Sequence, residues 1–309
     1  MKSINRPAFT LPVLALVIFL FTLISGFVKT DPSAGAVELM LTFSVIQVAI
    51  FVLPTVFYAK LKKLNFVRTA NLNLFAPARL ILIVALLGVM LTGSLLINLA
   101  VFALSGDAAL LESSSGSLSR IGETAGTFIT VIAVCIMPAV CEEFAFRGVI
   151  LGEYREYGAF PAVFASSLLF AMSHFSFPSF ASNFFCGIVL ASAVLITRSV
   201  FASMILHAAY NLCSLFFVPY IRSILFEPLG TLFTVFFCTG LFFVFLAFSF
   251  GEAQATYHEY ARKPQTARDE EIDRLRESKP PFSKGMISVF ASLTFALCIV
   301  IFILFTLFL

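Results

Sequence analysis

Long apolar runs, separated by short polar segments, extend over nearly the whole chain. A helix needs about 20 apolar residues to cross a hydrocarbon core of roughly 30 Å. Runs of about this length recur along the sequence, and they predict an all-α, polytopic transmembrane helix bundle of about nine spans. The predicted spans are residues 9–28, 38–59, 80–105, 125–150, 161–177, 182–198, 200–218, 229–250 and 286–309.

The composition supports a lipid environment. Hydrophobic residues make up 60% of the 309 residues and charged residues only 12%, and the mean hydropathy is +1.01. So much apolar surface excludes a protein that is surrounded by water, so membrane lipids are expected partners. The net charge of +3 follows from the loops. The sequence has no nucleic-acid-binding signature, and we expect no nucleic acid to bind.

The loop charges predict an orientation. With a cytoplasmic N-terminus, nine spans leave sixteen lysines and arginines on the inside and three on the outside. This bias agrees with the positive-inside rule. We therefore predict an integral multi-pass protein of the cell (plasma) membrane, with its N-terminus cytoplasmic and its C-terminus outside. The loop 251–285 balances seven basic against seven acidic residues, which indicates a solvated cytoplasmic linker with a short charged helix around 269–277.

One predicted span contains charges that a lipid environment disfavours. Glu142, Glu143 and Arg147 lie inside the otherwise apolar run 125–150. Such groups cost several kcal/mol at membrane depth, so they usually have partners and a function. Glu143 and Arg147 are four residues apart and can pair on one helical face. Glu142 points about 100° away, so the single arginine cannot neutralise both acids, and one carboxylate is left that could act as a general base.

Two further spans contribute polar groups at helical spacing. Phe170 and His174 lie in the fifth span, and His207 and Asn211 lie in the seventh. The latter two share a face at i, i+4. Arg155, Pro161 and Arg198 mark the predicted cytoplasmic ends of the three helices. Counted from these residues, Glu142, His174 and Asn211 each lie 13 residues into their helix, or about 20 Å along it. The fourth, fifth and seventh spans therefore bring polar groups to a similar depth.

These residues resemble a known family, the CAAX-protease and bacteriocin-processing (CPBP) membrane proteins, which are type II CAAX prenyl endopeptidase-like. The family patterns EExxxR, FxxxH and HxxxN appear here in order as Glu142-Glu143-x-x-x-Arg147, Phe170-x-x-x-His174 and His207-x-x-x-Asn211. The resemblance implies an intramembrane protease. It also implies that Glu143 and Arg147 brace the helix and set the charge of Glu142. Phe170 is expected to be either a plain packing residue or a residue that lines the site.

The resemblance further implies a division of roles among the polar residues. Glu142 and His174 would activate a water molecule, and His207 and Asn211 would stabilise the developing oxyanion. Amide hydrolysis needs both a base for water and donors for the tetrahedral oxygen, so this division agrees with the chemistry. The implied substrate is a membrane-bound or lipidated peptide, either CAAX-like or a bacteriocin or other peptide precursor.

The same resemblance suggests a division of the chain. The motifs cover roughly residues 125–218. On this basis we divide the chain into N-terminal transmembrane helices (1–124), a CAAX-protease-like catalytic helical core (125–250), the charged linker already described, and a C-terminal transmembrane helix (286–309).

Several alternatives stay open from the sequence. Glu142, His174 and His207 would also suit a catalytic Zn²⁺ site of the His₂Glu type, which would make the protein a metalloprotease. A serine–histidine pair could use Ser173 or Ser203. Outside protease chemistry, the same charges could serve a proton-coupled transporter or a non-catalytic immunity or scaffold protein. We favour the metal-free protease, because a carboxylate base with an oxyanion hole gives Asn211 a direct role.

Overall fold

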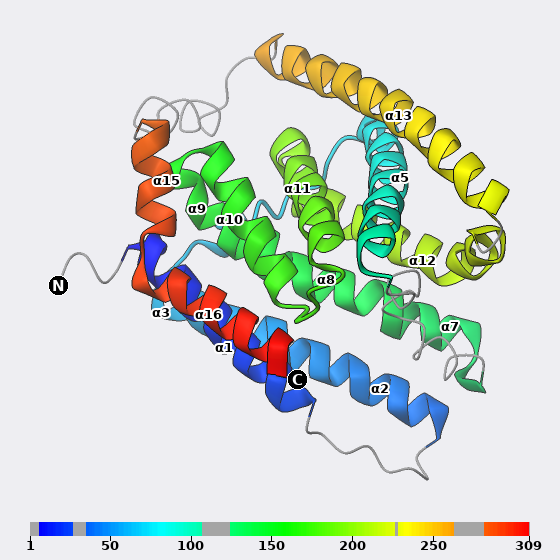
Figure 1. Ribbon diagram of the computed structural model, residues 1–309. Coiled ribbons are helices and arrows are strands. Elements are labelled where there is room, and N and C mark those ends of the chain that lie inside the picture. The colour runs from blue at the N-terminus through cyan, green and yellow to red at the C-terminus, as the bar shows by residue number, and fades with distance from the viewer. Residues whose placement is uncertain (1–5, 27–34, 107–123, 226–227, 263–280, 309) are drawn as a thin grey trace.

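The computed structural model describes residues 6–26, 35–106, 124–225, 228–262 and 281–308 (Figure 1). Within these ranges the secondary structure is entirely helical, as expected from the sequence. The elements are α1 (Pro7–Ser25), α2 (Ala36–Gln47), η1 (Val48–Val52), α3 (Leu53–Leu61), α4 (Phe66–Thr69), η2 (Pro77–Arg79), α5 (Leu80–Ser105), α7 (Thr127–Thr130), η4 (Val131–Ile136), α8 (Met137–Glu143), η5 (Phe144–Ile150), α9 (Leu151–Tyr154), η6 (Arg155–Tyr157), α10 (Ala159–Met172), α11 (Phe180–Thr197), α12 (Val200–Leu225), α13 (Pro228–Arg262), α15 (Phe282–Phe290) and α16 (Leu293–Phe308).

The described residues form seven helices that are long and apolar enough to cross a membrane, or eight if a bent pair counts as one span. The chain is therefore a multi-pass membrane protein. The nine expected spans are not confirmed, for two reasons. The fifth is represented by α10, an apolar helix of only 14 residues. The last is broken into α15 and α16, which meet at an angle of 59°.

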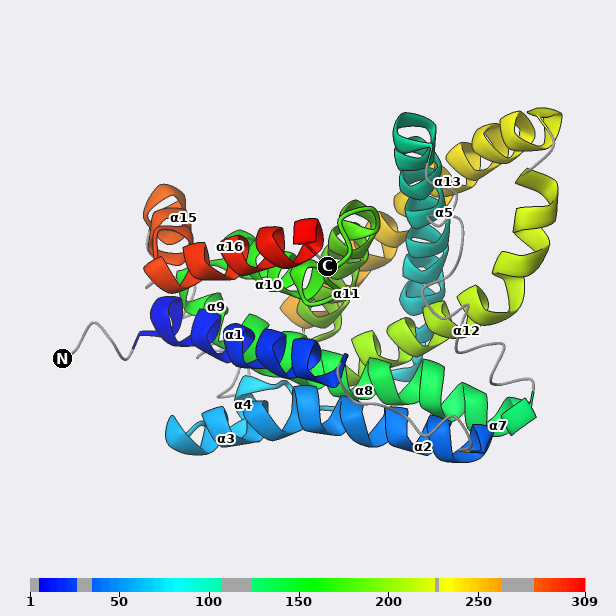
Figure 2. The same ribbon diagram turned by 60° about the horizontal axis from the view of Figure 1, so that its bottom comes forward.

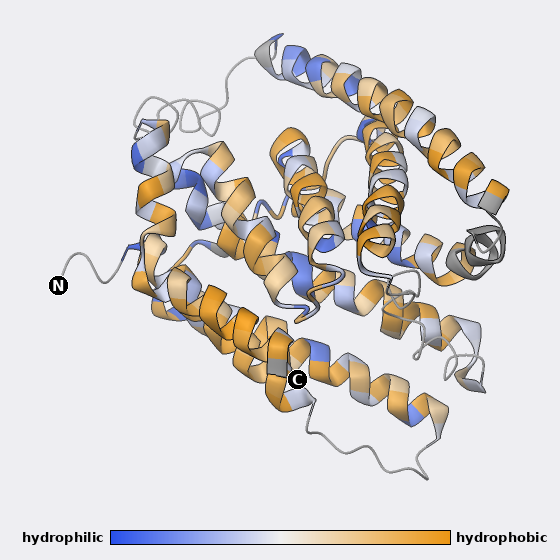
Figure 3. Cartoon of the chain, viewed as in Figure 1, coloured by the Kyte–Doolittle hydropathy of each residue, from blue (hydrophilic) through white to orange (hydrophobic). Residues whose placement is uncertain are grey.

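Helices that are distant in the sequence lie side by side. Helix α1 packs along α16, so the two ends of the chain form one face of the bundle (Figure 2). The continuous run α2–η1–α3 lies along the run α7–η4–α8–η5, with α2 beside α7 and α3 beside η5. Helix α13 packs mainly on α5 at the opposite side (Figure 1). Most helix surfaces are hydrophobic, and a hydrophilic segment appears where α8 crosses the middle of the bundle (Figure 3).

Three short segments within the described membrane-spanning helices are π-helical, and two of these precede a proline. Segment η1 ends two residues before Pro54, and segment η4 ends two residues before Pro138. Proline has no N–H and its ring displaces the carbonyl four residues earlier, so a widened turn can accommodate it within a continuous helix. The third segment, η5, follows directly after Glu143 and contains Arg147. Such π-helical turns are rare and often occur at functional sites.

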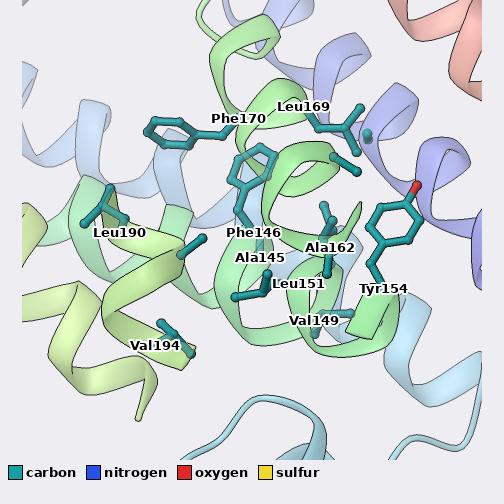
Figure 4. Close-up of a cluster of buried hydrophobic side chains, with 14 of the residues drawn as sticks. Ala145, Phe146, Val149, Leu151, Tyr154, Ala162, Leu169, Phe170, Leu190 and Val194 are labelled. Carbon is teal, nitrogen blue, oxygen red and sulfur yellow. The ribbon is translucent and has the colours of Figure 1, made fainter. Parts of the chain in front are cut away.

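The core of the bundle is aromatic and aliphatic. Phe146, Tyr154 and Leu190 are fully buried, and Phe170 is 3% exposed. They bring η5 and α9 against α10 and α11 (Figure 4). The carbonyl of Phe146 lies in a π-helical turn and accepts a hydrogen bond of 2.8 Å from the buried Ser166 hydroxyl. Tight packing of this kind fixes the orientation of the charged helix relative to its neighbours.

Helix α13 is longer than the predicted span 229–250. It continues to Arg262, so the first part of the expected linker is helical. Near this end the hydroxyl of Tyr260 donates to the carbonyl of Thr197 at 3.3 Å, and the Arg198 guanidinium lies 4.2 Å from the tyrosine ring centroid. The short charged helix expected around 269–277 lies outside the described residues.

Candidate active site

The charged group at the centre of the site is an ion pair. Glu143 and Arg147 are both 0% exposed, and Arg147 Nη1 donates to Glu143 Oε1 at 2.8 Å. Arg147 Nη2 donates to the backbone carbonyl of Gly187 on α11 at 3.2 Å. The guanidinium also lies 4.2 Å from the ring centroid of Phe170 on α10. The i, i+4 pairing predicted from the sequence therefore forms, and Arg147 connects three elements.

A histidine from α12 joins this pair. His207 is 6% exposed, and its Nδ1 lies 3.1 Å from Glu143 Oε1. An ionised carboxylate can only accept hydrogen bonds, so Nδ1 carries the proton and Nε2 is the nitrogen left for chemistry. The sequence analysis did not anticipate this contact. Only packing could reveal it, because His207 follows Glu143 by 64 residues.

Glu142 is the acid that the arginine does not neutralise. Its side chain is 7% exposed, and no group in the described part of the chain hydrogen-bonds to its Oε2 atom, which is buried. Because successive residues on a helix point about 100° apart, Glu142 lies to one side of the Glu143–His207 contact and takes no part in it. A buried carboxylate oxygen without a protein donor can accept a proton from a reacting molecule.

His174 lies just beyond the helix that was expected to contain it. Helix α10 ends at Met172, His174 is exposed, and Phe175 adopts a left-handed conformation with φ of 47°. The Ser173 hydroxyl donates to the Phe170 carbonyl at 2.7 Å, and His174 Nδ1 lies 2.9 Å from the same oxygen. These local bonds compete with the helical ladder and help to end it. A carbonyl only accepts, so His174 Nδ1 carries its proton and Nε2 offers a lone pair.

The Phe170 ring connects the separate motifs. Its centroid lies 4.8 Å from that of His174, 5.9 Å from that of His207 and 5.4 Å from that of Phe146. Figure 4 shows Phe146 beside Phe170 in the core, and the two rings meet edge to face. Together with the Arg147 contact, these distances place parts of all three sequence motifs around one aromatic side chain.

Asn211 lies one turn beyond His207 on α12. Its Nδ2 donates to the backbone carbonyl of Cys135 at 3.4 Å. Cys135 belongs to the π-helical segment η4, whose altered bonding pattern leaves carbonyls available to other donors. A carboxamide has two N–H donors, so one donor of Asn211 is used for positioning and the other is available to a ligand.

The serine and metal alternatives differ in their support. Ser173 donates to its own helix, as noted, and the Ser203 hydroxyl donates to the Val200 carbonyl at 2.9 Å. Neither hydroxyl is hydrogen-bonded to a histidine. Across the described residues, no three His, Cys, Asp or Glu side chains are grouped so that they could hold a metal ion. The geometry shown here therefore does not form the Zn²⁺ ligand set, and the zinc site stays a prediction.

The fold and these contacts define a multi-pass helical membrane protein with a buried acid–base cluster in its interior. Residues 124–213 contain a domain of the type II CAAX prenyl endopeptidase Rce1-like family, as shown by a match to the model of that family. This range includes all the polar residues described above, and the family suggests an intramembrane endopeptidase. Searches of curated proteins and of solved structures each found no match.

Proposed function

We propose that this protein is an intramembrane endopeptidase that hydrolyses a peptide bond of a membrane-associated substrate by a metal-free mechanism. The observation that carries the proposal is the buried, unpartnered Oε2 of Glu142 next to the Glu143–Arg147–His207 cluster. A site of this kind combines a base with a fixed polar environment, as amide hydrolysis at membrane depth requires.

In the proposed reaction, Glu142 takes a proton from water, and His174 assists through its free Nε2. The water oxygen forms a bond to the peptide carbonyl carbon, and the C–N bond breaks when Glu142 returns the proton to the leaving nitrogen. His207 and Asn211 stabilise the tetrahedral oxyanion. Since Glu143 holds the proton on Nδ1 of His207, this histidine can donate from Nε2 only as an imidazolium.

Charge balance supports the imidazolium form of His207. The cluster contains two carboxylates, from Glu142 and Glu143, and one permanent cation, Arg147. A protonated His207 brings the sum to zero, and a neutral sum reduces the cost of placing charges in a low-dielectric interior. The same ion pair between Glu143 and His207 also holds the ring in one orientation.

The substrate that fits this proposal approaches from the lipid and is a CAAX-like or lipidated peptide, or a bacteriocin or other peptide precursor. We also propose that the protein resides in the plasma membrane with a cytoplasmic N-terminus and an external C-terminus. In the zinc-dependent variant, Glu142 and the Nε2 atoms of His174 and His207 would hold the ion, which would supply a Lewis acid for the bound water.

The test is cleavage of a panel of tagged membrane peptides by purified protein in liposomes, with and without a chelator. Glu142→Gln should abolish cleavage. Glu38→Gln, which alters an exposed acid on α2, should not. Loss of activity with the chelator, restored by Zn²⁺, would replace the metal-free mechanism with the zinc variant. Cleavage by Glu142→Gln at the wild-type rate would refute the proposed base, and proton flux without cleavage would indicate a transporter.

A further inference from the structure

A carboxamide on a different span lies level with the proposed catalytic acid. Gln47 is the last residue of α2, in the middle of the apolar segment Ala36–Leu61. Its Oε1 atom is buried and has no hydrogen-bond partner within the described chain. Buried polar groups are almost always satisfied, so this oxygen needs a donor. Glu142 Oε2 has the same need.

The register between the two helices places Gln47 beside Glu142. The Tyr58 hydroxyl donates to Glu153 Oε2 at 2.7 Å, across a sequence separation of 95 residues. The ring centroids of Phe51 and Phe146 are 6.0 Å apart, and these two residues are also 95 positions apart in the sequence. Gln47 and Glu142 are separated by 95 positions as well.

The contacts extend to the other side of Gln47 as well. Met40, about two helical turns before Gln47, packs in one cluster with Ala133 and Val134. The two helices therefore run side by side both above and below the level of Gln47, and α8 packs against both α2 and η1. Just after this level each helix contains a π-helical segment, η1 in one and η5 in the other, and the separation of 95 residues holds at Phe51 and at Tyr58. The helix of Glu142 contains a second π-helical segment, η4, before this level, and there Met40 meets Ala133 and Val134.

The helical period sets the direction of the side chain. Met40, Gln47, Phe51 and Tyr58 follow the i, i+7, i+11, i+18 pattern of a single helix face. Three of these four are observed to contact the helix that contains Glu142 or its extension. Gln47 therefore faces this helix too. Glu142 lies four residues before Phe146 and eleven before Glu153, the residues that meet Phe51 and Tyr58, so it lies on the face of its helix that is turned toward α2 and η1.

One water molecule can donate a hydrogen to each of two acceptors at the same depth, and it is the smallest donor with two hydrogens. We propose that Gln47 is a further residue of the catalytic site, which holds the attacking water through its Oε1 while Glu142 Oε2 accepts the other hydrogen. The hydrogen on the Glu142 side is the one transferred, and the hydrogen on the Gln47 side stays on the oxygen as it bonds to the carbonyl carbon. The Nε2 of His174 accepts a hydrogen bond from that hydroxyl after the attack, when the oxygen has turned away from Gln47. The inference rests on the proposed hydrolysis.

The kinetic test compares Gln47→Met with Asn98→Leu. Methionine has a similar length but no carbonyl, and Asn98 is a matched control, because its buried Oδ1 also lacks a partner, on α5. We expect Gln47→Met to lower kcat about 100-fold, as loss of a positioning contact can do. KM and thermal stability should stay near the wild-type values, and Gln47→Asn should give an intermediate kcat. A kcat for Gln47→Met equal to that of the control, or a raised KM with unchanged kcat, overturns the inference.

An infrared measurement separates this inference from the proposed function. The carboxylate band of Glu142 is identified as the band lost in Glu142→Gln. It should shift in Gln47→Met and stay in place in Asn98→Leu. If Glu142→Gln cleaves normally, or wild type cleaves nothing, the protease proposal fails, and a band shift still supports the shared water. If Glu142→Gln is inactive but Gln47→Met changes neither rate nor band, only the role of Gln47 fails.

Discussion

Removal of the Arg147 guanidinium should destabilise the protein strongly. In Arg147→Met the carboxylate of Glu143 loses its partner at 2.8 Å, and the Gly187 carbonyl loses a donor at 3.2 Å. The contact with the Phe170 ring at 4.2 Å also disappears. Breaking a buried ion pair by removing one partner costs about 3 to 5 kcal/mol, because an uncompensated charge stays buried. We expect a loss in that range.

A double variant tests whether the loss comes from the charge. Glu143→Gln with Arg147→Met removes both charges and keeps an acceptor for His207. We expect it to be more stable than Arg147→Met alone by about 2 kcal/mol, a coupling typical of contacting residues. Arg79→Met provides the control. Arg79 is also buried, but its partner Glu259 has a side chain that is 42% exposed, so the acid left behind stays hydrated and the change should cost less than Arg147→Met.

Free thiols offer a direct assay. All six cysteines are unpaired, and four of them are buried. A thiol-reactive fluorogenic dye therefore reports unfolding in detergent as the temperature or the denaturant concentration rises. If Arg147→Met unfolds like wild type, or if the double variant is no more stable than the single one, the ion pair does not carry the stability assigned to it.

Three further changes test the packing around the site. Gly187→Ala would bring a methyl group to 2.9 Å from the Ser167 Cβ, so we expect about 1 to 3 kcal/mol of destabilisation in the dye assay, and a wild-type transition would contradict the close approach. Phe170→Leu removes the ring that contacts both histidines. The loss in cleavage rate, expressed as an activation free energy, should exceed the loss in unfolding free energy. Equal losses would assign the ring to packing alone. Tyr58→Phe removes the bond to Glu153, for which we expect about 1 kcal/mol, measured against wild type by the same thermal transition.

The sequence by itself determined the class of the protein and most of its charged site. Apolar runs of membrane-spanning length require helices, because backbone groups in lipid must bond within their own segment. The spacing of Glu143 and Arg147 brought them onto one face, and their pairing followed from local geometry alone. Order and spacing of the three motifs also indicated the resemblance to type II CAAX prenyl endopeptidases, and residues 124–213 match the model of that family.

Only the tertiary structure decided the cross-helix relations. His207 meets Glu143 because α12 packs on α8, and no local pattern encodes that choice of partner. His174 lies beyond α10 because side-chain bonds to the Phe170 carbonyl end the helix, although the apolar run continues to residue 177. Gln47 is a lone amide in an apolar span and belongs to none of the three motifs, so the sequence alone does not distinguish it. Its significance depends on the register between two helices, which is set by side-chain packing over their whole length.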